Sequence, residues 1–92
     1  MAFQASGTSG EVRKGYQVAV RLGSWSLSDG RLEAQASEIQ DVWLDMPGQV
    51  DLWLRMGRTF WVWSNVDVAD RGQPFVIRVG GSPQVRGAPS AT

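Results

Sequence analysis

The side chains that most often do chemistry in proteins are missing from this sequence. Its 92 residues contain no histidine and no cysteine. The commonest general base near neutral pH is therefore absent, as are thiolate nucleophiles, disulfides and thiolate metal sites. A nucleophile would have to be a serine, a threonine or a carboxylate, activated by an acidic side chain or by Lys14, the one lysine. We predict no catalytic residues and expect that the protein is not an enzyme.

Oxygen ligands for a metal gather at one place, the segment NVDVAD, which contains Asn65, Asp67 and Asp70. The segment lacks the central glycine and the distant bidentate glutamate of a calcium-binding EF-hand loop. Asparagine and aspartate also cap turns, and we favour that role here. Gly80 and Gly81 follow an apolar run but open no helix, so they do not form a phosphate-binding loop. We therefore predict no metal and no cofactor.

Aromatic residues next to arginines offer chemistry of another kind. Trp53 and Phe60, rimmed by Arg55 and Asp51, could stack on a sugar ring or another small ligand. With Arg55 and Arg58 beside them, the same aromatic rings would suit the bases of a single-stranded nucleic acid. The formal net charge of zero weighs against nucleic acid, because a phosphate backbone requires an excess of cations.

Charge is unevenly distributed along the chain. Residues 29–51 hold six acidic side chains and a single base, Arg31, whereas the flanking segments hold eight bases and three acids. Pairing between strands of opposite charge within one sheet accounts for this pattern. Attraction between unlike ends of two copies of the chain is the alternative.

Two hairpins are predicted from turn chemistry. Asp29-Gly30 suits a type I′ turn, whose two central residues both need positive φ. That turn places Leu27 opposite Leu32 and Trp25 opposite Ala34. Further along, Gly57-Arg58 suits a type II′ turn with glycine in the first central position. The second turn pairs one set of apolar residues on a single face: Met56 with Thr59, Leu54 with Trp61, and Leu52 with Trp63.

Residues 37–46 fit two interpretations. Ile39, Val42, Trp43 and Met46 follow helical spacing, and a short helix would start near Ser37. We favour a strand, because the turn residues that follow would lead directly into the next strand. The choice decides whether this segment lies beside residues 50–56.

Alternating apolar and polar residues in most other segments, including 16–22 and 75–79, predict further strands. We therefore expect an all-β, single-domain antiparallel barrel or two-layer sandwich of about six or seven strands. The Gly-, Ser- and Pro-rich ends predict flexible arms at 1–12 and 81–92 around a β domain at 13–80. The predicted core consists of Trp25, Leu27, Leu32, Trp43, Leu52, Leu54, Trp61 and Trp63.

A second apolar face remains after the core is assigned. If residues 42–46 form a strand, this face joins aromatic, aliphatic, Met and Arg side chains, types that are enriched in the centres of protein interfaces. A half-exposed antiparallel sheet has one polar face, so something is expected to cover this one. The predicted contact surface consists of Val42, Leu44, Met46, Trp53, Arg55, Phe60 and Val62.

These observations predict a structural or assembly protein that binds other proteins, above all copies of itself. Architectural analogy alone favours a virion-type assembly, and an inhibitor or adaptor that caps a larger protein fits equally well. The binding of a sugar, of another small ligand or of a single-stranded nucleic acid remains an alternative. Apolar runs fall far short of the ~20 residues of a membrane span. The first residues do not resemble a secretory signal, so we expect a cytoplasmic protein or one assembled in the cytoplasm.

Overall fold

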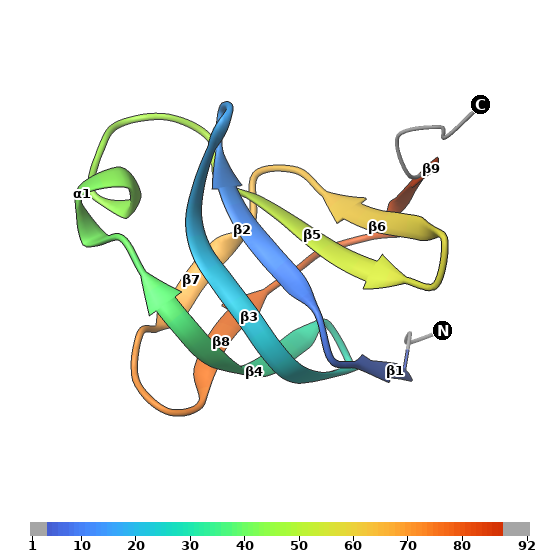
Figure 1. Ribbon diagram of the computed structural model, residues 1–92. Helices are drawn as coiled ribbons and strands as arrows, with labels where there is room; N and C mark the ends of the chain where they lie inside the picture. Colours follow the sequence, from blue (N-terminus) through green and yellow to red (C-terminus); the bar gives the residue numbers. More distant parts are fainter. Residues whose placement is uncertain (1–3, 88–92) are drawn as a thin grey trace.

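The computed structural model describes residues 4–87, in which nine strands form one antiparallel sheet that curls into a half-barrel (Figure 1). This confirms the predicted small all-β domain, with two strands more than the larger number expected. Eight strands follow one another in the order β7-β8-β4-β3-β2-β5-β6-β9, and β1 pairs separately with β3. The strands are β1 (Gln4–Gly7), β2 (Gly10–Lys14), β3 (Gln17–Ser28), β4 (Arg31–Ile39), β5 (Asp51–Met56), β6 (Thr59–Trp63), β7 (Asp67–Asp70), β8 (Phe75–Arg78) and β9 (Gln84–Gly87).

Both predicted hairpins are confirmed. Asp29 and Gly30, with φ of 53° and 76°, connect β3 to β4 in the conformation that a type I′ turn requires. Leu27 lies opposite Leu32 in this hairpin. In the second hairpin the φ of Gly57 is 64°. The cross-strand pairs of both hairpins are those expected: Trp25–Ala34 between β3 and β4, and Leu52–Trp63, Leu54–Trp61 and Met56–Thr59 between β5 and β6.

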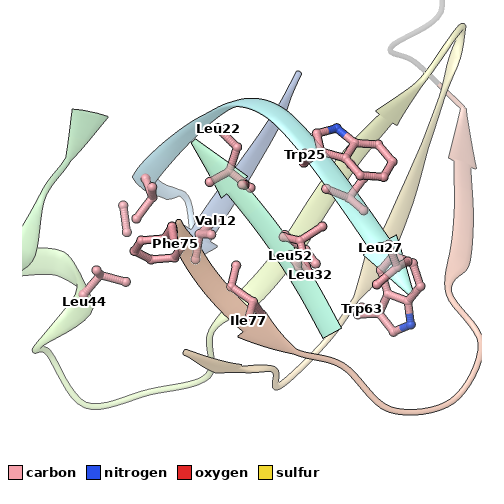
Figure 2. Packing of buried hydrophobic residues seen from close by; sticks show 14 residues of the cluster. Val12, Leu22, Trp25, Leu27, Leu32, Leu44, Leu52, Trp63, Phe75 and Ile77 are labelled. Atoms are coloured by element: carbon pink, nitrogen blue, oxygen red, sulfur yellow. The ribbon is translucent and has the colours of Figure 1, made fainter. Parts of the chain in front are cut away.

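One face of the curled sheet encloses the core. Figure 2 shows its side chains gathered on one side of the strands, with Leu44 approaching from the helix on the side of Phe75. Six of the eight predicted core residues are buried, while Trp43 and Trp61 are partly buried and pack against the others. The indole of Trp25 donates a hydrogen bond to the carbonyl of Ser9 at 2.9 Å. The fully or nearly fully buried apolar residues of this core are Val12, Ala19, Val20, Leu22, Trp25, Leu27, Leu32, Ala34, Leu44, Leu52, Leu54, Trp63, Phe75 and Ile77.

The strand favoured for residues 37–46 is wrong in its second half. β4 ends at Ile39, and a single helical turn, α1 (Asp41–Leu44), follows it. The carbonyl of Gln40 accepts hydrogen bonds from the amides of Trp43 and Leu44, at 3.0 and 3.3 Å. This turn places Leu44 in the core with 7% of its surface exposed. A strand continuing past Ile39 would have pointed alternate residues of this segment away from the core.

Polar contacts hold α1 against the rest of the fold. The ammonium group of Lys14 donates hydrogen bonds to the carbonyls of Leu44, at 3.0 Å, and Met46. From the connection between β7 and β8, the guanidinium of Arg71 reaches Asp45 at 2.8 Å and Asp41 at 3.1 Å. The hydrogen bond to Asp45 is the main reason why the pKa of Arg71 is raised above its ordinary value. Because these groups are exposed, the ion pairs orient α1 more than they stabilise the domain.

Parts of the two segments predicted as arms belong to the sheet. β1 and β2 fall within residues 1–12 and just beyond, and β9 falls within 81–92. These strands were missed because they contain glycine, serine and charged residues and contribute few apolar side chains. The rest of the predicted arms, residues 1–3 and 88–92, lies outside the described part of the chain. In the described part, no helix is long and apolar enough to cross a membrane.

Replacing a core residue by alanine tests this packing. Leu54 is fully buried, so Leu54→Ala should lower the free energy of unfolding by about 2–5 kcal/mol. Val42, which is 64% exposed, provides the control, and Val42→Ala should change the same quantity by less than about 0.5 kcal/mol. Urea denaturation followed by tryptophan fluorescence measures both variants. Equal effects would contradict the assignment of the buried face.

Candidate binding surface

The side of the sheet opposite the core carries a group of aromatic and charged residues. Leu52 and Leu54 are fully buried on the core side, so Trp53 between them points outward. Pairing across the strands extends this arrangement from β2 to β9 (Figure 1). We call this surface the Trp53 face; it consists of Glu11, Arg13, Trp53, Arg55, Phe60, Val62, Gln84 and Arg86.

At its centre two aromatic rings each lie beside an arginine. The rings of Trp53 and Phe60 meet edge to face, with centroids 5.5 Å apart and planes inclined by 68°. The guanidinium of Arg13 lies over the Trp53 ring, 4.2 Å from its centroid. That of Arg55 lies 5.9 Å from the centroid of Phe60. Such geometry allows cation–π attraction and leaves guanidinium hydrogens available to other partners.

Glu11 holds Arg13 in position. Its carboxylate accepts a hydrogen bond of 2.9 Å from the Nε of Arg13, and lies 3.9 Å from a guanidinium nitrogen of Arg21 on β3. Because Glu11 lies opposite Trp53 in the β2–β5 register, the carboxylate fixes a cation directly beside the indole. The carboxylate thus restricts the positions that the Arg13 guanidinium can take beside the indole.

The outer apolar patch is partly covered by the chain itself. Val62 belongs to this face by register, yet only 4% of its surface is exposed. Trp53 and Phe60 are half-buried. Arg13 occupies one side of the Trp53 ring. The apolar surface exposed to solvent is therefore smaller than the predicted patch. Aromatic groups lie at its centre and charged groups lie around it.

The structure separates the seven residues predicted for the contact surface. Trp53, Arg55, Phe60 and Val62 share the Trp53 face, as expected. The other three are not on it, because β2 and not residues 42–46 lies beside β5. Val42 and Met46 are 64% and 47% exposed in and just after α1, whereas Leu44 is in the core.

Four residues of the face were not predicted: Glu11, Arg13, Gln84 and Arg86. Each alternates with a valine that faces the core side, Val12 in β2 and Val85 in β9. This alternation is the signal that sequence reasoning could have used. It was too short to stand out, because each of these strands contains only one such valine.

A shallow hollow of about 350 Å³ adjoins the face between β2, β3 and β6. Glu11, Arg21, Arg55 and Phe60 contribute to its lining, together with Ser9, Gly10, Leu22 and Ser37. One carboxylate and two guanidinium groups make the hollow mainly polar. It suits a polar side chain of a partner better than an apolar ligand.

The turn favoured for the candidate metal segment NVDVAD is only partly correct, because Asp67–Asp70 form β7 and Asp67 lies opposite Arg78 of β8. Asp70 accepts a hydrogen bond of 2.8 Å from the amide of Gly72. Asn65 has a φ of 57° and donates its backbone N–H to Asp51 at 3.3 Å. Among residues 4–87, no three acidic side chains come close enough together to hold a metal ion.

Comparison with protein-family models, with curated proteins and with solved structures found no match for this chain. The function of the Trp53 face is therefore inferred from its own chemistry.

The cover that Arg13 provides can be tested by fluorescence quenching. Arg13→Ala removes the cation from the Trp53 ring, so acrylamide should quench tryptophan fluorescence more strongly, while stability falls by about 0.5–1 kcal/mol. Arg58→Ala, at an exposed arginine in the β5–β6 turn, is the control and should leave quenching unchanged. In a Trp53→Phe background the effect of Arg13→Ala should disappear. If it persists, Arg13 covers a different tryptophan.

Proposed function

We propose that this protein is a non-enzymatic assembly protein that binds other protein chains, its own copies included, through the Trp53 face. One observation carries the proposal: a half-buried pair of aromatic rings, each with an arginine beside it, at the centre of an exposed polar surface. Trp and Arg are among the residue types that most often dominate binding energy at protein interfaces.

The arrangement of the face supports this interpretation. Its centre is aromatic and partly desolvated, and its margin carries Glu11, Gln84 and Arg86, which can form hydrogen bonds with a partner. Protein interfaces have this pattern of an apolar centre and a polar rim. Arg13 occupies one side of the Trp53 ring, where a sugar would otherwise stack, so the geometry favours a protein over a carbohydrate.

The biological setting is proposed from architecture alone. A small β domain without histidine or cysteine suits a multi-subunit shell such as a virion. The same surface would serve an inhibitor or an adaptor that caps a larger protein. In each setting the binding energy comes from burying Trp53 and Phe60, at roughly 25 cal/mol for each Å² of apolar surface removed from water.

Single-stranded nucleic acid is a second candidate, because Arg13, Arg55 and Arg86 lie on the same face as the two aromatic rings. Glu11 on this face and the net charge of zero oppose it. The two candidates differ in their salt dependence. Affinity for a single strand should fall linearly with the logarithm of salt concentration, with a slope of about −0.7 for each phosphate contacted.

Aspartate substitutions on opposite faces test the proposed surface. Trp53→Asp should abolish association and leave the domain folded, because the new charge remains near water. Trp63→Asp should unfold the chain, because it places an unpaired charge in the core. Size-exclusion chromatography with light scattering, over a hundredfold range of concentration, measures association, and circular dichroism measures folding.

The outcomes separate the possibilities. Unfolding by both variants would contradict the assignment of Trp53 to a functional surface. A wild-type protein that is monomeric at every concentration would exclude self-association and leave binding to a different protein. Binding of a single-stranded oligonucleotide with the salt slope given above would favour the second candidate.

A further inference from the structure

The path of eight strands has two open ends, while β1, off this path, pairs with β3 alone among the described residues. Along the path of eight strands, β7 and β9 come last, and among the described residues each pairs with one neighbour, β8 and β6 respectively. Figure 1 shows the two strands on opposite sides of β3, well apart. An unpaired edge exposes backbone N–H and C=O groups that can bind another strand.

The directions of these two edges are compatible with each other. Every neighbouring pair on the path is antiparallel, and the path contains an even number of strands. Suppose that β7 of one chain joins β9 of another so that the core side of both sheets faces the same way. The two joined strands would then also be antiparallel. The joined sheet would keep one alternation of faces across both copies.

The side chains of the two edges also match. Val68 in β7 lies opposite Ile77 on the core side, and Val85 in β9 lies opposite Trp61 on the same side. Val85 is 65% exposed, an unusual position for an apolar side chain that has core-side neighbours. Placing Val68 opposite Val85 in an antiparallel register sets Asp67 opposite Arg86 on the outer side.

Charge supports this register. β7 carries Asp67 and Asp70 and no base, whereas β9 carries Arg86 and no acid. Asp67, Asp70 and Arg86 are all exposed. Pairing β7 with β7 of another copy, or β9 with β9, would bring like charges together or leave the charged side chains without an opposite charge. β7 and β9 are therefore better partners for each other than for their own copies.

We infer that β7 of one copy pairs with β9 of a second copy, so that chains associate head to tail through a continuous sheet. This inference rests on the self-association part of the proposed function, but it uses the sheet edges instead of the aromatic centre of the Trp53 face. Arg86 belongs to both surfaces, so Asp67 and the recovery of association in a mixture of variants distinguish them. The contact joins two different edges, β7 of one copy and β9 of the next, so it can repeat from copy to copy. The copies form a ring if the rotation between successive copies closes on itself, and a filament if it does not. The β-bulge between Val68 and Asp70 limits regular pairing to a few residues, so the contact forms at high concentration and dissociates on dilution.

Charge reversal on the two edges tests the inference. Asp67→Arg and Arg86→Asp should each weaken association at least about fivefold, because each places like charges opposite one another. An equimolar mixture of the two variants should associate again, since the arginine introduced on β7 of one chain then meets the aspartate introduced on β9 of the other. The double variant Asp67→Arg/Arg86→Asp should also recover association. Arg58→Asp, in the β5–β6 turn and on neither edge strand, is the matched control and should behave as wild type.

Analytical ultracentrifugation across the same concentration range measures these effects, and thermal unfolding confirms that each variant is folded. Loss of association in the single variants without recovery in the mixture would overturn the edge pairing, as would a wild-type protein that stays monomeric. If Trp53→Asp abolishes association while the charge reversals leave it unchanged, the Trp53 face carries self-association and the edge inference fails. If the charge reversals abolish association while Trp53→Asp leaves it unchanged, the edge contact is supported and the Trp53 face does not carry self-association.

Discussion

The fold depends on the pairing of β2 with two strands at once. β2 bonds to β3 on one side and to β5 on the other, and among the described strands it alone joins the part of the sheet containing β7, β8, β4 and β3 to the part containing β5, β6 and β9. A Cβ atom at Gly10 would lie 3.0 Å from the Trp53 carbonyl and 3.1 Å from a Leu54 methyl. Glycine at this position therefore lets β5 approach β2 closely. Val12, the next residue of β2 on the core side, is fully buried where the two parts of the sheet meet.

The same strand shapes the proposed binding surface. Glu11 and Arg13 flank Val12 and point to the other side of the sheet, where they fix a cation over Trp53. The five residues of β2 thus serve the core through one face and the candidate site through the other. A change that displaces β2 would disturb both, which ties the integrity of the site to the folding of the domain.

The parts of the fold that follow from local chemistry could be predicted from the sequence. Asp29-Gly30 and Gly57-Arg58 each fix a turn, and a turn fixes the register of the strands beside it. Non-local pairings were not predictable in this way. β2 and β9 are recognisable as strands only once β5 and β6 are there to pair with them. Leu44 of α1 likewise packs against core residues that are distant in the sequence.

The candidate site shows the same division. Trp53, Arg55 and Phe60 were placed correctly because they belong to one hairpin, while Val42 and Met46 were placed wrongly because their position depended on which strand lies beside β5. The alternation in β5 also makes core and site inseparable. A slip of one residue in its register would bury Trp53 and Arg55 and expose Leu52 and Leu54, so burial of the two leucines is what keeps the aromatic pair on the outer surface.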